Sequence, residues 1–197
     1  MLLNDVEKIM MNNPLRAAVQ RQWEGRRLLR LGGEAPKGIV LEVGCGCGVG
    51  VEIILDRLHA ERAHAFDLDP HMVTLAQKRL NRKNRPAYVW VGDVTRIPAP
   101  DATYAAVFDF GIIHHVPNWR DAITEIHRVL KPGGRFYVEE IMRRFVLNPI
   151  VRTLTVHPLE DRFDMPEFHA GLEQAGFTVT NTAKFLGWAA WFIAEKQ

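Results

Sequence analysis

The chain has 197 residues, of which 47% are hydrophobic and 24% charged, and this composition suits one globular domain with an ample core. The formal net charge is only +2, which disfavours a polyanionic partner, so we expect no nucleic-acid substrate. No apolar run reaches the roughly 20 residues of a membrane span, and polar residues interrupt the N-terminus too early for a signal peptide. Both cysteines lie in one glycine-rich stretch, so no disulfide framework is indicated and we expect a cytoplasmic protein.

Residues 1–37 predict a helical cap ahead of the first strand. Pro14 behind Asn13 is a favourable helix start, and Gly32 with Gly33 ends the segment. Between them, arginines alternate with apolar side chains at helical spacing, namely Leu15, Ala18, Val19 and Trp23. Two interpretations are open: the helix packs on the sheet edge, or it also covers a ligand and helps to select the substrate.

The stretch from residue 39 to residue 58 predicts a strand, a glycine turn and a helix. Ile39–Val43 is a short apolar run that suits a strand buried on both faces of a parallel sheet. Glycine then occupies every second position from 44 to 50, and residues 51–58 carry apolar side chains at helical spacing. Such a turn brings bare backbone N–H groups and a helix N-terminus against a ligand, and Glu42 adds a carboxylate beside it. A turn without a ligand is the weaker alternative, because a mere turn rarely needs four glycines.

The spacing of these glycines discriminates between ligands. The dinucleotide fingerprint requires glycine at 49 or 51, where the chain has valine, and the phosphate-loop signature lacks its lysine. Residues 41–48, Leu-Glu-Val-Gly-Cys-Gly-Cys-Gly, instead resemble the first motif of class I S-adenosylmethionine (SAM) dependent methyltransferases. The resemblance implies SAM as the cofactor, in contact with Glu42, Gly44, Cys45 and Gly46. Cys47 departs from the family pattern, in which Thr or Ser is commoner.

The second predicted strand, residues 63–66, ends at Asp67. An acid in this place can accept hydrogen bonds from both ribose hydroxyls of a nucleoside, in dehydrogenases as well, so Asp67 indicates an adenosine ligand without selecting the cofactor. Asp69 is interpreted as the N-cap of a helix over residues 71–80, with Pro70 at its first position. The resemblance extends the cofactor site to Leu68 and Met72.

The third predicted strand, residues 87–91, is followed by Gly92, Asp93 and Val94. In methyltransferases similar to this chain, an acid here accepts a hydrogen bond from the exocyclic amine of adenine, and the next N–H meets the ring. The resemblance therefore assigns Asp93 and Val94 to the cofactor site. Taken alone, a Gly-Asp pair would be a turn. The order of three motifs at successive strand ends, rather than any one motif, favours the site.

Residues 104–108 predict the fourth strand, and Phe110 and the pair His114 and His115 follow it. A helix over 119–130, the sequence Lys-Pro-Gly-Gly at 131–134 and a fifth strand over 135–139 come next. This succession resembles the type-11 methyltransferases, a group that includes quinone-biosynthesis enzymes, and it adds Phe110 to the implied cofactor site. A helix over 165–175 and an antiparallel pair of strands, 178–185 and 188–195, complete the chain.

The resemblance covers residues 38–197 and implies an α/β fold. We expect a Rossmann-like, doubly wound, mostly parallel sheet of seven strands, with an antiparallel last strand and helices on both faces. A single domain would comprise the cap at 1–37, a cofactor-binding core at 38–140, a substrate lid at 141–164, and a C-terminal helix with a strand pair at 165–197.

Methyl transfer from a sulfonium is an in-line displacement in which positioning can supply on the order of 7–11 kcal/mol. A carbon or phenol acceptor also needs a base to take its proton. His114 and His115 are candidates because they follow the strand beside the methyl site, although they could equally pack and orient this loop. His157 is a weaker third candidate. Cys45 and Cys47 cannot by themselves supply the four ligands of a closed zinc site, so we expect no metal.

The segment from 142 to 164 matches no familiar pattern. Leu147, Leu154 and their apolar neighbours stand among three arginines, which suits a small hydrophobic acceptor that carries an anionic group or comes from a membrane surface. We expect this lid to cover the methyl site together with the helix around Trp23; the alternative is a surface insertion. Two other functions stay open, a SAM-binding protein without catalytic activity and, less favoured by the missing third glycine, an NAD-dependent oxidoreductase.

Overall fold

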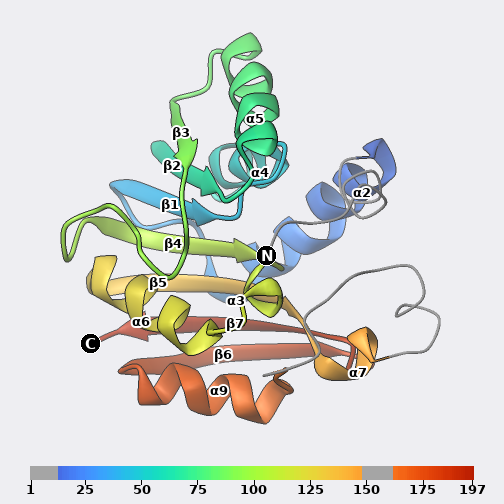
Figure 1. The fold of residues 1–197 in the computed structure, drawn as a ribbon, viewed down its shortest axis with the longest axis vertical. Helices are drawn as coiled ribbons and strands as arrows, with labels where there is room; N and C mark the ends of the chain where they lie inside the picture. The colour runs from blue at the N-terminus through green and yellow to red at the C-terminus, as the bar shows by residue number, and fades with distance from the viewer. Residues whose placement is uncertain (1–12, 148–161) are drawn as a thin grey trace.

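A seven-stranded sheet with the strand order β3-β2-β1-β4-β5-β7-β6 organises the chain (Figure 1). The computed structural model describes residues 13–147 and 162–197. Strands β1 to β5 run parallel to their neighbours among these five, and β7 is antiparallel to both β5 and β6. The strands are β1 Ile39–Val43, β2 Arg62–Asp67, β3 Ala87–Val91, β4 Tyr104–Phe110, β5 Leu130–Ile141, β6 Phe177–Phe185 and β7 Ala189–Lys196. This arrangement confirms the predicted fold class.

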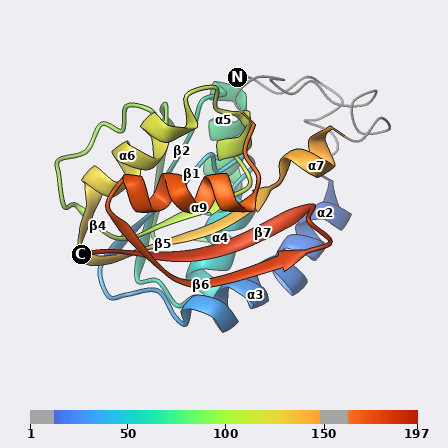
Figure 2. The same cartoon turned by 90° about the horizontal axis from the view of Figure 1, so that it is seen from below.

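Helices cover both faces of the sheet (Figures 1 and 2). Helices α6 and α9 pack on one face, and α3, α4 and α5 pack on the other. The helices are α2 Pro14–Val19, α3 Gly25–Gly32, α4 Val49–Asp56, α5 Pro70–Arg82, α6 Trp119–Val129, α7 Arg143–Val146 and α9 Met165–Gln174, with a π-helical turn η1 (Gln20–Glu24) and a 3-10 turn η2 (Ile113–His115). Within the described ranges, no helix is both long and apolar enough to cross a bilayer.

Alternation along the strands sorts the core into two layers. In β1, Leu41 and Val43 join the cluster under α6 and α9, whereas Val40 joins the cluster under α4. Because successive side chains of a strand point to opposite faces, a strand covered on both sides must be apolar at every position. Glu42 breaks this rule, since it is a carboxylate with only 1% of its surface exposed. A buried acid in a central strand needs a partner or a function.

Local capping places the helices that face the carboxyl edge of the sheet. Asp69 is the N-cap of α5, where its carboxylate accepts a hydrogen bond of 2.8 Å from the His71 N–H, and Pro70 occupies the first helical position. This confirms the interpretation of Asp69 as a cap. Helix α9 begins with a capping box in which Asp164 and Glu167 each satisfy the backbone N–H of the other.

Most element boundaries differ from the sequence predictions by one or two residues, and two differences are larger. Helix α6 ends at Val129 and β5 begins at Leu130, so the Lys-Pro-Gly-Gly sequence lies inside the strand, where the pairing with β4 shifts register. The N-terminal helix also contains the π-helical turn at Gln20–Glu24, which apolar spacing alone does not predict. Residues 1–12 of the cap and 148–161 of the predicted lid, with Leu154 and His157, lie outside the described residues.

Candidate cofactor and active site

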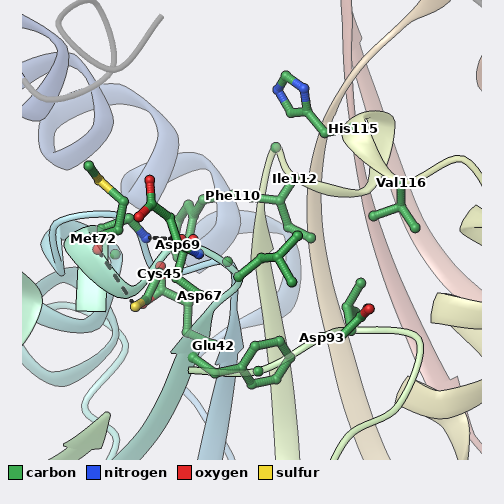
Figure 3. A pocket seen from close by; sticks show the side chains of 18 of the residues that line it. Glu42, Cys45, Asp67, Asp69, Met72, Asp93, Phe110, Ile112, His115 and Val116 are labelled. Carbon is green, nitrogen blue, oxygen red and sulfur yellow. Dashed lines mark hydrogen bonds between the residues drawn. The ribbon is translucent and has the colours of Figure 1, made fainter. Parts of the chain in front are cut away.

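A cavity of about 360 Å³ opens at the carboxyl ends of β1, β2, β3 and β4 (Figure 3). Ligands of open α/β sheets bind at this edge. All ten residues that the sequence assigns to the cofactor line the cavity: Glu42, Gly44, Cys45, Gly46, Asp67, Leu68, Met72, Asp93, Val94 and Phe110. Four separate strand ends therefore bring the predicted set to one place.

The glycine turn leaves room for a ligand against bare backbone. Gly46 has a φ of +50°, and no atom lies within 4 Å of the position that a Cβ would take, so the space beside it is open. Gly50 is required for another reason, because a Cβ there would lie 1.9 Å from Oε1 of Glu42. The first glycine gives access to the cavity and the second gives room to a buried carboxylate.

Asp67 connects the glycine turn to β2. Its Oδ2 accepts a hydrogen bond of 2.8 Å from the Gly46 N–H, and its Oδ1 accepts one of 2.9 Å from the Asp69 N–H. These two bonds fix the carboxylate at the cavity wall, and a carboxylate has further lone pairs that can accept hydroxyl groups of a ligand. Burial raises the pKa of the Asp67 carboxyl above its usual range, with the neighbouring Asp69 charge as a smaller contribution.

Glu42 lies deeper in the same wall. Burial raises the pKa of Glu42 well above its usual range, and the charges of Asp67 and Asp109 raise it further. Its Oε2 has no hydrogen-bond partner among the described residues, although it is fully buried. An orphaned buried oxygen beside a cavity is costly unless a ligand donates to it. A cationic ligand group, such as the ammonium of SAM, would satisfy this oxygen, so the site fits the cofactor that the sequence implies.

Asp93 and Val94 form the wall after β3. The Oδ1 of Asp93 accepts hydrogen bonds from the N–H of Thr95 at 2.9 Å and from its hydroxyl at 2.8 Å. Asp93 therefore does act as a turn residue, and it also lines the cavity. Val94 is buried against the core under α6. Figure 3 shows Asp93 and Val116 on one side of the cavity and Cys45 and Met72 on the other.

The structure separates the two candidate histidines. His115 lines the cavity, whereas His114 does not and is buried. The Nδ1 of His114 lies 2.7 Å from Oε2 of Glu140, and its carbonyl accepts a hydrogen bond of 2.8 Å from Arg162. Of the pair, only His115 is placed to contact a ligand in this cavity, and His114 instead belongs to the network that holds the η2 turn.

Glu140 is the centre of that network. Its Oε1 accepts hydrogen bonds from the backbone N–H groups of Ile113 at 2.6 Å and His114 at 3.3 Å. Burial raises the pKa of Glu140 to about 7. Asp109 is also fully buried, and burial together with the Glu140 charge raises its pKa well above the usual range. Burial and the neighbouring Glu140 charge both favour the protonated form of the Asp109 carboxyl, so a second negative charge beside Glu140 under the active-site loop is disfavoured.

Sequence reasoning missed part of the cavity wall. The loop after β4 contributes Ile112, Val116, Pro117 and Asn118, and the cap contributes Gln20. The loop could have been found, because it follows a parallel strand directly at the carboxyl edge. The helix around Trp23 was expected to cover the site, and the structure places its Gln20 at the cavity. The Trp23 ring itself packs edge-on against Phe185 at 5.4 Å and Trp191 at 5.1 Å.

The cysteines are placed as small residues of the turn. Cys45 is buried, and burial raises the pKa of its thiol well above the usual range, while Cys47 is half-buried. In the two ranges that the structure describes, no three His, Cys, Asp or Glu side chains are grouped so that they could hold a metal ion.

Comparison with known proteins finds relatives over about three quarters of this chain. Residues 41–138, from β1 to β5, match the family described as methyltransferase domain. A probable S-adenosylmethionine-dependent methyltransferase from Mycolicibacterium smegmatis is 33% identical over 73% of this chain and 53% of its own length. A fatty-acid O-methyltransferase from the same organism is 30% identical over 73% of this chain and 47% of its own length. The chain thus spans about half the length of the curated relatives it matches.

Solved structures extend the similarity to the whole fold. A SAM-dependent methyltransferase from Aquifex aeolicus covers 98% of this chain and 98% of its own chain with a TM-score of 0.74 and 20% identity. The sheet order, the glycine turn with its acids at successive strand ends, and the match over β1 to β5 agree. The chain belongs to the methyltransferase-domain family, whose members have the class I fold and use SAM as their cofactor.

Proposed function

We propose that this chain transfers the methyl group of SAM to a small hydrophobic acceptor. The observation that carries the proposal is the single cavity in which cofactor residues from four strand ends meet His115 and the apolar loop after β4. Of the two relatives from Mycolicibacterium smegmatis, one is named as SAM-dependent and the other as a methyltransferase of fatty acids. An acceptor of that hydrophobic kind would suit a wall of Ile112, Val116 and Pro117.

The chain's own residues would divide the work of binding the cofactor. Asp67, already oriented by two backbone N–H groups, would accept the ribose hydroxyls. Asp93 and the N–H of Val94 would form hydrogen bonds with the adenine. The Glu42 oxygen that has no partner in the described ranges would accept a hydrogen bond from the ammonium group. The open backbone at Gly46 would lie against the chain that joins these parts. When bound, SAM supplies an electrophilic methyl group and leaves as a neutral thioether that needs no acid.

His115 would take the proton of an acceptor that must lose one. It lies on the short η2 turn, and Glu140 accepts hydrogen bonds from the backbone N–H groups of Ile113 and His114 in that turn, so the backbone that carries His115 has a fixed place at the cavity wall. Positioning is the main contribution available to this reaction, because an in-line displacement needs donor and acceptor held at the correct angle. The segment 141–164 remains our candidate for the substrate lid, together with Gln20 of the cap.

Thermal unfolding with S-adenosylhomocysteine, SAM or NAD tests the cofactor half of the proposal. Binding to the native state raises stability by RT ln(1 + [L]/Kd), so a ligand at about a hundred times its Kd stabilises by about 2.7 kcal/mol. We expect a shift with the first two ligands and none with NAD at the same concentration. A shift with NAD alone would favour the oxidoreductase.

Transfer of labelled methyl groups from SAM to a lipid extract tests the catalytic half. We expect the wild type to form a methylated product, which mass spectrometry identifies, and a variant without His115 to form far less of it. Tight binding of S-adenosylhomocysteine with no methylated product from lipid or aqueous extracts would favour a SAM-binding protein without catalytic activity.

A further inference from the structure

Exposed apolar side chains gather on three neighbouring segments at one end of the molecule. Ten large apolar residues of the described chain are exposed, and seven of them lie on the cap, at the C-terminal end of α7 and around the β6–β7 turn. They are Leu15, Val19, Trp23, Leu147, Phe185, Leu186 and Trp188, and we call this set the apolar face. Leu15 is 75% exposed and Leu186 63% exposed. Single exposed leucines are ordinary, but a group of exposed apolar side chains on neighbouring segments marks an interaction surface.

Ring contacts join the three segments into one surface. Trp23 of the cap lies 5.4 Å from Phe185 of the β6–β7 turn, and Phe145 of α7 lies 5.8 Å from Trp188 of the same turn. Within the cap, Leu15, Val19 and Trp23 follow one another at intervals of four residues and so share one side of the helix. These contacts join the cap, α7 and the β6–β7 turn, and the helical spacing places Leu15 and Val19 on the same side of the cap as Trp23.

Positive charge is concentrated around the apolar face. Residues 14–32, 143–147 and 184–188 contain eight basic residues and one acidic residue, Glu24, which is buried. The whole chain has a net charge of only +2, so the remainder of the chain is net negative. Four of the basic side chains are exposed and have no carboxylate partner in the described part of the chain: Arg26, Arg30, Arg144 and Lys184.

The apolar face borders the edge of the sheet at which the cavity opens. In Figures 1 and 2, α2, α7 and the turn between β6 and β7 lie toward the side where the carboxyl ends of β1 and β4 point. The cap connects the two features directly, because Gln20 lines the cavity while Val19 and Trp23 belong to the apolar face. A surface that met this face would thus be close to the proposed acceptor entrance.

We propose that the apolar face docks on an anionic phospholipid surface, from which the enzyme draws a lipid-dissolved acceptor. Aromatic and aliphatic side chains enter the headgroup region, and surrounding arginines meet lipid phosphates. A second copy of the chain is a poor occupant, because pairing through this face would bring two groups of like charge together. The proposal rests on the proposed methyltransferase function and names the phase that holds its acceptor.

Vesicle co-sedimentation tests the docking. The full chain should bind phosphatidylcholine vesicles that contain about one quarter phosphatidylglycerol, should bind pure phosphatidylcholine far less, and should be released by salt. Each basic residue near an anionic surface contributes about a fivefold increase in partition, so Arg26→Gln with Arg30→Gln should weaken binding about 25-fold. Arg82→Gln with Lys131→Gln removes the same charge from elsewhere and should change binding by less than about threefold.

A second pair of variants tests the apolar contribution. Leu186→Ser should weaken vesicle binding at least fivefold, since it removes an exposed leucine side chain that would be buried in the headgroup region. Tyr88→Ser is the matched control, because Tyr88 on the edge strand β3 is also 63% exposed but lies outside the apolar face. Retention of S-adenosylhomocysteine binding by all variants would show that the cofactor half is intact, so that lost docking and lost function are distinguished.

Three results would overturn the docking. They are no binding to anionic vesicles, equal binding to both vesicle types with no response to the arginine changes, and a concentration-dependent dimer in sedimentation velocity that Leu186→Ser dissolves. The last result would assign the face to a second copy. The cofactor half of the proposed function is tested separately in each case, because S-adenosylhomocysteine binding is measured without vesicles.

Discussion

At the scale of single residues, the cavity wall is made of acids that differ in how they are held. Asp67 accepts two backbone N–H groups, Asp93 accepts two groups of Thr95, and Glu42 keeps one oxygen without a partner in the described structure. The acids that are already bonded can orient a neutral hydroxyl or amine. The orphaned oxygen instead favours a ligand that brings a positive charge, because only a strong donor offsets its burial.

Asp67→Asn should weaken S-adenosylhomocysteine binding tenfold or more. A charged acceptor contributes about 1.5–3 kcal/mol to a hydrogen bond, and the amide also loses one of the acceptor oxygens that the ribose would share with Gly46. Isothermal calorimetry gives the affinity, and circular dichroism checks the fold. Asp121→Asn, at an exposed position of α6, should leave the affinity unchanged. Equal affinities for both variants would remove Asp67 from the cofactor site.

His115→Gln and His114→Gln should have different consequences. His115 lines the cavity, so its loss should lower the rate of methyl transfer by about 10²–10⁴-fold when the acceptor must lose a proton, with S-adenosylhomocysteine affinity unchanged. His114 is buried on Glu140, so its replacement should lower the free energy of unfolding by about 1–3 kcal/mol. Turnover, calorimetry and urea denaturation separate the two. A stable His114 variant without turnover would reverse the assignment.

At the scale of elements, the η2 turn owes its shape to an acid on the neighbouring strand. Four nitrogen atoms lie within hydrogen-bond distance of Glu140, and three of them are backbone N–H groups, of Ile113, His114 and Ile141. A turn held in this way presents His115 without needing contacts from the ligand. The sequence places both histidines after β4, but it does not show that Glu140, 25 residues after His115, separates their roles. That information lies in the pairing of β4 with β5.

The raised pKa of Glu140 predicts a loss of stability as the pH rises. The folded carboxyl holds its proton up to about pH 7, whereas the unfolded carboxyl releases it near 4.5. Between these values the native state binds more protons, so the free energy of unfolding falls by up to about 1.4 kcal/mol per pH unit. Burial also raises the pKa of Asp109, Glu42 and Glu139, so the free energy of unfolding falls more steeply as the pH rises.

Urea denaturation across this range should therefore show a smaller slope for Glu140→Gln than for the wild type. Gln cannot ionise, so the variant loses the contribution of this one carboxyl and keeps the others. Glu125→Gln is the control, because side-chain bonds to Arg128 lower the pKa of Glu125 and its stabilising contribution is lost only as the pH falls below the unfolded value. Parallel slopes for Glu140→Gln and the wild type would place the titration of Glu140 outside this range.

At the scale of the whole molecule, the sequence predicted most of the fold and ten of the residues that line the cavity. Periodicity and glycine spacing report local structure, so Ile39–Val43, the turn and Asp67 were placed correctly from their own neighbours. Contacts between distant segments leave no such local signal. Trp23 packs on Phe185 and Trp191, more than 160 residues later in the chain, while Gln20 of the same helix lines the cavity. The spacing of apolar residues also does not predict the π-helical turn that contains both residues.

Trp23→Ala tests whether this packing couples the cap to the cofactor. Removing the ring deletes two edge-on aromatic contacts, each contributing about 0.5–1.5 kcal/mol, on the side of η1 away from the cavity. The variant keeps the contact of Arg27, whose guanidinium carbon lies 4.3 Å from the centre of the Trp191 ring, but this contact alone binds the cap to the sheet more weakly than both contacts together. We expect the cap to open, trypsin to cleave at Arg26 and Arg30 several-fold faster, and S-adenosylhomocysteine affinity to fall several-fold because Gln20 leaves the wall.

The matched control is Leu15→Ala on the same cap. Leu15 is exposed and has no ring contact to the sheet, so its loss should change neither cleavage nor affinity. Faster cleavage of Trp23→Ala with unchanged affinity would mean that the cap and the cofactor are independent, and Gln20 would then be a neighbour of the cavity rather than a part of the cofactor site. If instead saturating S-adenosylhomocysteine restores the wild-type cleavage rate of the variant, ligand and cap stabilise each other, as binding linkage requires of two parts of one site.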